Sequence, residues 1–144
     1  MEKETITFTT RGCKKTDYSF VFGLVKKSLF PFVAKYYQPD KAMFDERFYH
    51  DYKERTIILR GKRRIGFYHL VPQVGVLHVK GIFISSAYQR KGIGQFLMRY
   101  FETLGFKRIL LEVWENNPAY RFYRKWGYCV FKKKNHKYFM EKRL

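Results

Sequence analysis

The sequence lacks the features of a disulfide-stapled, metal-binding or membrane-spanning protein. Only 2 of its 144 residues are cysteines, Cys13 and Cys129, and they lie too far apart for metal-ligand spacing. We therefore expect two free thiols and no metal site. No apolar run reaches membrane-spanning length, and the N-terminal stretch lacks the apolar segment of a signal peptide. The default expectation is a cytoplasmic protein.

Acidic residues are the second shortage. The chain has 12 of them against 30 lysines and arginines, which gives a net charge of +18. Such a charge attracts polyanions and speeds their arrival. A solvated basic surface, the steering of a polyanionic ligand, and contact with a nucleic acid or an acidic protein all fit this charge. The basic residues are scattered along the chain rather than gathered in one stripe.

Apolar residues, by contrast, are plentiful. They make up 46% of the chain and aromatic residues 20%, which excludes disorder and supplies a substantial core. The length predicts one domain over residues 1–144, and no repeat, linker or low-complexity tract divides the chain.

The stretch of residues 77–104 organises the rest of the chain. Residues 77–84 are apolar and often β-branched, as in a covered strand, and Gly81 within them indicates a bulge or a close approach. A turn follows over residues 85–91, and a helix begins near Gly92. The predicted apolar face of this helix comprises Ile93, Phe96, Leu97, Tyr100, Phe101 and Leu104.

This turn and the start of the helix form a candidate anion site. A helix N-terminus carries free backbone N–H groups and the positive end of the helix dipole. Gly92 and Gly94 let an anion approach that backbone closely, and Arg90 and Lys91 add positive charge. The sequence therefore predicts a cradle for a pyrophosphate group. It is neither a P-loop nor a dinucleotide fingerprint, because Leu97 stands where the third glycine would be.

The remaining segments predict an α/β (α+β) fold. Residues 108–114 follow a strand and a helix, so the crossover makes this strand parallel to the central one. The element order is βααβββαβαββ, with helices on both faces of a mixed, mostly antiparallel, twisted sheet. The other predicted elements are a strand at 4–10, a helix capped by Asp17 and divided by Pro31 that runs to about Tyr37, a helix at 41–52, strands at 55–60 and 64–71, a turn from Pro72, a helix from Asn117 to Gly127, and strands at 128–131 and 138–141 around a loop KKKNHK.

Two segments resemble motifs of one enzyme family. The pattern Q/R-x-x-G-x-G/A is matched by Gln89-Arg90-Lys91-Gly92-Ile93-Gly94. The pattern N-P-A-x-x-x-Y-x-x-x-G-F is similar to Asn117-Pro118-Ala119, Phe122-Tyr123 and Trp126-Gly127-Tyr128, with Tyr128 for the final Phe. Both belong to the GNAT superfamily of acetyl-CoA-dependent N-acetyltransferases. The resemblance implies a single GNAT-like domain whose fourth and fifth strands, 77–84 and 108–114, splay apart to hold the pantetheine arm of acetyl-CoA.

The resemblance also implies which residues hold acetyl-CoA. The backbone of Ile82, Phe83 and Ile84 would pair with the pantetheine arm like an added strand and donate an N–H to the reacting carbonyl. Asn117 is placed to touch the coenzyme and also suffices as a helix cap, while Asn116 takes its place if the register shifts by one. The pyrophosphate would rest on the backbone of Gln89, Arg90, Lys91, Gly92, Ile93, Gly94 and Gln95. For the side chains of Arg90 and Lys91, contact with the coenzyme and exposure without contact fit equally well.

For the reaction, the resemblance implies direct attack of a primary amine. Tyr123 holds the general-acid position, and a phenol of pKa about 10 can protonate a leaving thiolate. His78 stands eleven residues before Gln89, where the histone-acetylating branch has a catalytic Glu, and an imidazole suits a general base. A histidine packed on the strand fits equally well, and Glu112 acting through water is the second candidate. Tyr120 is expected in the core.

The sequence does not specify the amine, since a small molecule and a peptide both fit. Some aromatic residues either line the amine's groove or belong to the core, namely Phe32, Tyr36, Tyr37 and Phe44. Cys129 could carry an acetyl group, but its place in an apolar strand indicates inert packing. Two other hypotheses are a basic nucleic-acid- or ribosome-associated module and a coenzyme-binding protein without catalysis. A monomer and a homodimer are both compatible with the sequence.

Overall fold

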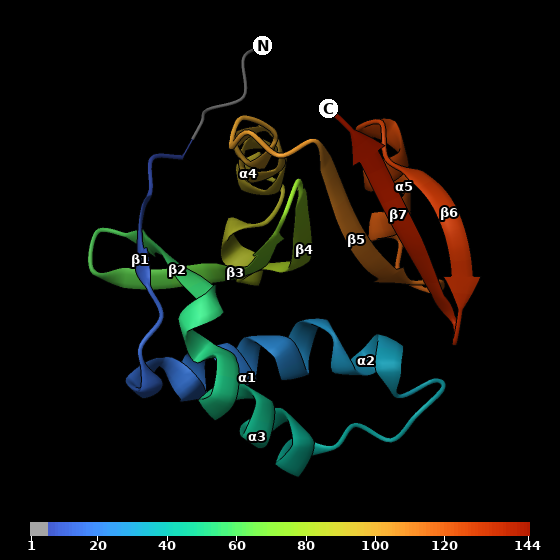
Figure 1. Cartoon of the computed structure of the whole chain (residues 1–144). Coiled ribbons are helices and arrows are strands. Elements are labelled where there is room, and N and C mark those ends of the chain that lie inside the picture. The colour runs from blue at the N-terminus through green and yellow to red at the C-terminus, as the bar shows by residue number, and fades with distance from the viewer. Residues whose placement is uncertain (1–5) are drawn as a thin grey trace.

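The computed structural model describes residues 6–144 and shows a seven-stranded mixed sheet with helices packed against it (Figure 1). The strands are β1 (Thr9–Gly12), β2 (Arg55–Arg60), β3 (Arg63–Gln73), β4 (Val76–Ile84), β5 (Arg108–Trp114), β6 (Cys129–Lys134) and β7 (Lys137–Arg143). The helices are α1 (Tyr18–Ser28), α2 (Phe30–Val33), α3 (Lys41–Asp51), α4 (Ile93–Glu102) and α5 (Ala119–Lys125). The predicted order of elements is confirmed, with the first helix in two pieces. Within residues 6–144, no helix has the length and apolar character needed to cross a membrane.

The strands follow the order β1-β2-β3-β4-β5-β7-β6 across the sheet. Every neighbouring pair is antiparallel except β4 and β5, which run parallel because α4 crosses over between them. This is the mixed, mostly antiparallel sheet that the sequence predicts. The predicted strand at 4–10 lies partly outside the described residues, and within them the pairing starts at Thr9.

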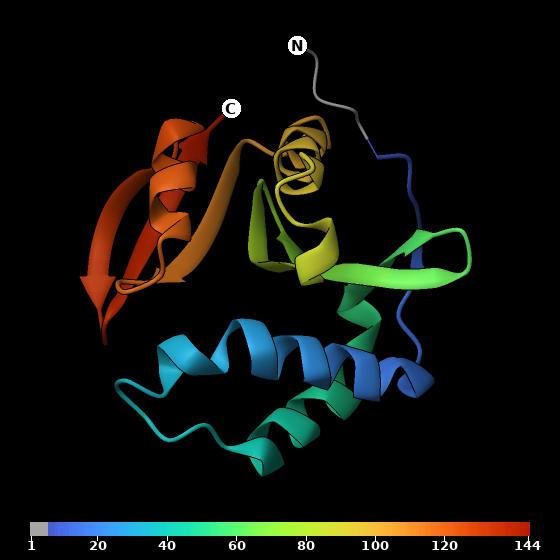
Figure 2. The same ribbon diagram turned by 180° about the vertical axis from the view of Figure 1, so that it is seen from behind.

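The two faces of the sheet carry separate hydrophobic cores. Neighbouring residues of β2 show the alternation, because Ile57 packs with α1 and α3 whereas Ile58 packs with α4. Both isoleucines are fully buried. In Figures 1 and 2, α1, α2 and α3 lie below the sheet and α4 lies above it. Helices therefore cover both faces, as predicted.

The first helix divides as its proline predicts, but it starts differently. α1 ends at Ser28, and the single turn α2 follows with Pro31 near its start. Asp17 occupies the N-cap position of α1, as predicted, but its side chain makes no capping hydrogen bond. Its buried carboxylate instead accepts hydrogen bonds from Arg11 at 2.8 and 2.9 Å and from the backbone N–H of Lys14 at 2.8 Å. These bonds, that of Arg11 above all, hold the pKa of Asp17 well below its usual range.

α4 buries a narrower stripe than predicted. Phe96, Tyr100 and Leu104 are exposed, whereas Met98 is buried. The exposed residues lie on the flanks of the stripe that meets the sheet, and Phe96 packs edge-on against Phe8 with ring centroids 5.6 Å apart. The buried residues of α4 are Ile93, Leu97, Met98 and Phe101.

The last two strands are longer than predicted. The expected loop KKKNHK is a two-residue turn, Asn135-His136, whose φ angles of 51° and 66° suit this kind of hairpin. Residues 132–134 therefore belong to β6, an edge strand whose residues are all exposed. Cys129 is exposed in that strand, so its predicted packing is wrong. β3 also continues through Pro72, where the sequence predicts a turn. β2 pairs with β3 only as far as His69, so Pro72 lies where β3 has a free edge, and a free edge tolerates a residue without an N–H.

β4 and β5 pair only over their first residues. Residues 76–79 lie opposite residues 108–111, and beyond these pairs β4 continues to Ile84 and β5 to Trp114 without pairing. The register of β4 against β3 shifts beside Gly81, where the sequence predicts a bulge. The predicted splay of the two strands is therefore present, and Figure 2 shows their ribbons diverging.

Candidate functional site

A pocket of about 210 Å³ lies where β4 and β5 part. It joins the free end of β4, the turn before α4, the first turn of α4 and one face of α5. Phe83 turns its ring away to stack on Phe67 on the other face, with centroids 4.8 Å apart, so only its backbone remains for the predicted pairing. The lining residues are Ile82, Ile84, Gln89, Gly94, Ala119, Phe122, Tyr123 and Trp126.

The start of α4 presents its backbone to this pocket. Gly92 precedes the helix with a φ of 85° and offers no side chain to cap it. Its carbonyl accepts the first helical bond from Phe96 N, so the N–H groups of the first turn remain available to an anion. A Cβ at Gly94 would meet no atom within 4 Å, which shows open space beside this backbone. The geometry is that of an anion-binding helix N-terminus.

The polar side chains of the preceding turn have different roles. Gln89 donates from Nε2 to the carbonyl of Ile84 at 2.9 Å, which fastens the turn to the end of β4. Arg90 and Lys91 are exposed, and within residues 6–144 neither forms an ion pair. Arg90 has a φ of 60° and Gly92 one of 85°, and left-handed residues of this kind occur in the backbone turns whose N–H groups bind anions. The turn is thus held by Gln89 and carries two free positive charges.

Tyr123 lies on the pocket side of α5. Its ring packs edge-on against Trp126 and Tyr128, with centroids 5.8 and 6.2 Å away. Burial raises the pKa of the Tyr123 phenol to about 12, because the charged phenolate would lose its hydration. The phenol therefore stays protonated at neutral pH, and its hydroxyl makes no hydrogen bond within the described part of the chain. A protonated, unengaged hydroxyl on a residue that lines the pocket is a candidate donor to a bound ligand.

The two asparagines before α5 divide the predicted roles. Asn117 accepts from the backbone N–H of Ala119 at 2.9 Å through Oδ1, which is a capping bond. Asn116 donates from Nδ2 to the carbonyl of Phe32 at 3.3 Å. Its Oδ1 is the single buried side-chain nitrogen or oxygen within residues 6–144 that has no partner. An orphaned buried acceptor is costly, so this atom is a candidate partner for an incoming N–H group, and Asn116 itself lies outside the lining of the 210 Å³ pocket.

His78 faces the other side of the sheet. Leu77 and Val79 point into the α4 core, so the alternation of β4 turns His78 toward α1 and α2. Its Nε2 lies 3.9 Å from Oε1 of Glu112, too far for a hydrogen bond. Burial, chiefly, and the nearby Lys80 ammonium lower the pKa of His78, so the imidazole is neutral at pH 7. The predicted acid and base thus lie on opposite faces of the parting between β4 and β5.

A cluster beside the end of β5 has no signal in the sequence motifs. Glu115 accepts from the hydroxyl of Tyr36 at 2.9 Å and lies 3.1 Å from Nδ1 of His136 and 2.7 Å from Nζ of Lys133. These hydrogen bonds, led by that of Lys133, lower the pKa of Glu115 to about 2. The ring of Tyr36 also stacks on His136 with centroids 3.9 Å apart. The cluster joins the loop after α2, the end of β5 and the β6–β7 hairpin, three segments that only the fold brings together.

The four aromatic residues expected near the acceptor separate into two groups. Phe44 packs against the core of α1 and α3, so it is a core residue. Tyr36 and Tyr37 lie beside Trp114 at the end of β5, with ring centroids 5.9 and 6.0 Å from it. The carbonyl of Phe32 holds Asn116. Three of the four residues therefore adjoin the parting, and one does not.

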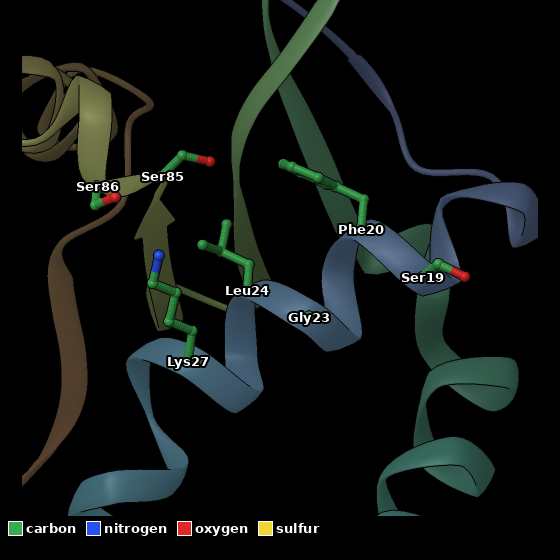
Figure 3. Close-up of a pocket in the computed structure, with 7 residues that line it drawn as sticks. All are labelled: Ser19, Phe20, Gly23, Leu24, Lys27, Ser85 and Ser86. Atoms are coloured by element: carbon green, nitrogen blue, oxygen red, sulfur yellow. The ribbon is translucent and has the colours of Figure 1, made fainter.

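A second pocket, of about 300 Å³, lies between α1 and the segment after β4 (Figure 3). Figure 3 shows Lys27 extending from α1 toward Ser85 and Ser86, beside the apolar Leu24. Neither Tyr123 nor His78 lines it. The two pockets therefore share the end of β4, but only the first contains a predicted catalytic residue.

Comparison with known proteins identifies the fold and the family. The sequence model of the acetyltransferase (GNAT) family matches residues 23–128. A PaiA N-acetyltransferase from Thermoplasma acidophilum, solved with coenzyme A, has a TM-score of 0.74 at 19% identity, over 96% of this chain and 99% of that one. The ribosomal-protein-S18-alanine N-acetyltransferase from Escherichia coli has a TM-score of 0.69 at 14% identity, over 95% and 94%. No curated protein matches the chain.

The structural neighbours share less than a quarter of their residues with this chain, so they show the fold alone. Ard1 from Thermoplasma volcanium, with a TM-score of 0.70 at 19% identity over 95% of this chain and 97% of that one, gives the same result. The family model, in contrast, spans most of the sequence and includes both the turn before α4 and the segment around Tyr123. On that match, together with the parted strands and the uncapped helix start, this chain belongs to the GNAT family of acetyltransferases.

Proposed function

We propose that the chain, as a single domain over residues 1–144, transfers the acetyl group of acetyl-CoA to a primary amine. The observation that carries this proposal is one pocket that combines an uncapped helix start with a protonated, unengaged phenol, that of Tyr123. The first feature suits a pyrophosphate and the second suits a leaving thiolate. The coenzyme A bound to the Thermoplasma acidophilum neighbour supports the same ligand class for this fold.

The residues that would hold acetyl-CoA fit its chemistry. The backbone from Ile82 to Ile84 has no strand partner on the β5 side and can pair with the amides of a pantetheine arm. The N–H groups of Lys91 to Gln95 can donate hydrogen bonds to the pyrophosphate, with Arg90 and Lys91 adding charge. The orphaned Oδ1 of Asn116 can accept from a pantetheine N–H, which favours Asn116 over the capping Asn117.

The reaction needs one group that accepts a proton and one that donates a proton. Bound acetyl-CoA supplies an activated acetyl group as a thioester. His78 is neutral at pH 7 and lies on the face of α1 and α2, so it can take the proton of an amine that arrives there, directly or through water. Tyr123 lies on the opposite face and can donate its phenolic proton to the departing sulfur. A backbone N–H from Ile82 to Ile84 is the candidate donor to the carbonyl oxygen. Glu112 is the alternative base.

Titration calorimetry with acetyl-CoA tests this function. We expect heat of binding and a raised melting temperature with the native sequence. Gly94→Glu puts a carboxylate at the helix start and should weaken binding about 10-fold or more through charge repulsion. Gly12→Glu on β1, where a Cβ also meets open space, makes the same charge change far from the pocket and should bind normally. No heat and no melting shift at high acetyl-CoA would overturn the proposal. Where acetyl-CoA does bind, a panel of primary amines with thiol detection identifies the acceptor class.

Nucleic-acid binding is the second candidate function, and one feature favours it. Residues 55–101 contain no aspartate or glutamate. Within this stretch the guanidinium of Arg63, beside the β2–β3 turn, lies 6.0 Å above the ring of Tyr88, so that turn adjoins the anion-binding turn. Retention on heparin or RNA that falls steeply with salt would support this function. No retention at low salt would remove it.

A further inference from the structure

One lysine already lies at the point where β4 and β5 part. Leu111 makes the last pair with β4, so Glu112 is the first residue of β5 beyond the pairing. Lys137 pairs with Trp114 across β5 and β7, and its side chain turns back toward Glu112. Its Nζ lies 3.5 Å from Oε2 of Glu112 and 4.9 Å from the ring centroid of Trp114. The ammonium therefore rests on a carboxylate and an aromatic face beside the parting.

The same carboxylate connects this ammonium to the candidate base. Oε1 of Glu112 lies 3.9 Å from Nε2 of His78, while Oε2 faces Lys137. The two nitrogens thus flank one carboxylate. An amine in this position has a neutral imidazole nearby to receive its proton, which an amine needs to lose before it can act as a nucleophile.

The other lysines compared with Lys137 lack this combination of contacts. Lys133, on the same hairpin, pairs with Glu115 at 2.7 Å, beyond the end of β5. Lys142, further along β7, pairs with Glu102 at 2.8 Å. Lys80 also follows the last pair of β4 but is exposed, and it forms no ion pair within the residues that the structure describes. Lys137 is distinguished by a held ammonium, a carboxylate at the parting and a nearby base.

We propose that Lys137 is an acetylation site of the protein itself, modified from acetyl-CoA bound in the same molecule, a step that rests on the proposed acetyl transfer. The Lys137 ammonium loses a proton to His78, and its Nζ attacks the carbonyl carbon of the thioester. A C–N bond forms and the C–S bond breaks. The sulfur leaves as a thiol with a proton from Tyr123. The second proton lost from the lysine nitrogen then restores the Tyr123 phenol. The balance is one ε-acetyl-lysine, one free coenzyme thiol and one proton released to solvent through His78.

Acetylation would change the acceptor side of the parting. The product amide carries no charge, so Glu112 loses its cation and the face of Trp114 loses its cation–π contact. A free carboxylate and a free aromatic face are the groups that bind an external ammonium. The modified protein should therefore show a lower KM for a cationic amine than the Lys137→Arg variant, which keeps its positive charge and gives no acetyl-lysine.

Site-resolved mass spectrometry tests the proposal on the full chain incubated with acetyl-CoA. We expect acetyl occupancy at Lys137 to rise about 10-fold or more faster than at Lys133, because an amine held beside the thioester reacts as if concentrated. The first-order rate constant for the rise in fractional occupancy should be independent of protein concentration, as a step within one molecule requires. Glu112→Gln should slow it, and heat-unfolded chain should give equal, slow labelling of both lysines.

Three results would overturn the inference. They are equal labelling of Lys137 and Lys133, faster labelling of Lys80 than of Lys137, and a rate constant for fractional occupancy that rises in proportion to protein concentration. Failure of the acetyltransferase itself is distinguishable, because calorimetry measures acetyl-CoA binding without any transfer. If acetyl-CoA binds and external amines are acetylated while Lys137 stays unmodified, only the proposal for Lys137 is wrong. If acetyl-CoA gives no heat, the proposed function and this inference are both wrong.

Discussion

The two halves of the β4–β5 pair are built from the same two strands, but they differ in almost every physical property. In the paired half, Leu77 and Val79 of β4 lie beside Ile109 and Leu111 of β5, and all four side chains are buried in one core. In the parted half, the backbone of β4 has no neighbour on the β5 side, and the pocket takes the place of the ladder. Polar groups without internal partners are found there.

The difference indicates where this chain keeps stability and where it keeps function. Buried aliphatic contacts contribute most of the free energy of folding, and an unpaired strand edge contributes little. An edge held open beside a rigid core, however, is a preformed site for a ligand with amide groups. Substitutions in the paired half should therefore change the free energy of unfolding, and substitutions in the parted half should change binding and turnover.

The largest expected effect belongs to the paired half. Ile109 is fully buried, so Ile109→Ala should lower the free energy of unfolding by about 3 kcal/mol through lost contacts and a cavity. Urea denaturation measures this loss. Glu112→Gln, three residues along the same strand in the parted half, should change it by less than about 0.5 kcal/mol, because the ion pairs of Glu112 are partly exposed. Equal losses in the two variants would contradict the division between the halves.

The second effect belongs to the parted half. Tyr123→Phe removes the hydroxyl without emptying the space of the ring, so kcat should fall about 100-fold if this phenol protonates the leaving thiolate. Coenzyme affinity and melting temperature should change little, because the hydroxyl makes no hydrogen bond within residues 6–144. Steady-state kinetics at saturating acetyl-CoA and calorimetry measure the two quantities. A Tyr123→Phe variant with unchanged kcat would exclude Tyr123 as the general acid.

A smaller effect separates two neighbouring residues. Asn116→Ala removes the orphaned Oδ1 and should weaken acetyl-CoA binding about 10-fold, the value of one good hydrogen bond, while loss of the Nδ2 bond to Phe32 should lower stability by about 1 kcal/mol. Asn117→Ala removes a cap from α5 and should lower stability by about 1 kcal/mol while affinity is kept. Calorimetry and thermal unfolding of both variants give the comparison. If Asn117→Ala weakens binding and Asn116→Ala does not, the assignment from the orphaned atom is wrong.

Local signals in the sequence predict most of the fold. The strand at 108–114 and the start of α4 follow from side-chain periodicity and from Gly92, which are properties of neighbouring residues. The crossover rule then makes β4 and β5 parallel. The Lys-rich hairpin misleads, because a run of exposed lysines reads as a loop although an edge strand also tolerates lysines.

The details of the site depend on contacts between distant segments, which no local pattern contains. Glu115 connects Tyr36 with His136, residues 100 positions apart in the chain. Lys137 lies in the segment that the sequence predicts as a loop, so its contact with Glu112 could not be anticipated. Asp17 has the residue type of a helix cap, but Arg11 and the fold around it use the carboxylate differently.

The last prediction concerns His78, which belongs to the paired half by its backbone and to the parted half by its chemistry. It pairs with Leu110, yet its ring lies near Glu112. Burial lowers its pKa, so the folded chain binds a proton less readily than the unfolded chain, whose histidine has a pKa of about 6.5. The free energy of unfolding should therefore fall as pH drops below about 6.5, where only the unfolded state takes up the proton. Asp17 and Glu115 have lowered pKa values and titrate in a more acidic range.

Unfolding measurements at about pH 7.5 and about pH 5.5 test this sign, since an imidazole changes charge between them. His78→Gln should lose less stability between these values than the native sequence. His69→Gln should do the same, because burial also lowers the pKa of His69. Since His69 pairs with Glu54 outside the site, His69→Gln is the matched control for the kinetics. If His78 is the base, the acid limb of kcat/KM should have its midpoint below about 6.5 and should be absent in His78→Gln but kept in His69→Gln. A midpoint that stays in His78→Gln would transfer the role of base to Glu112.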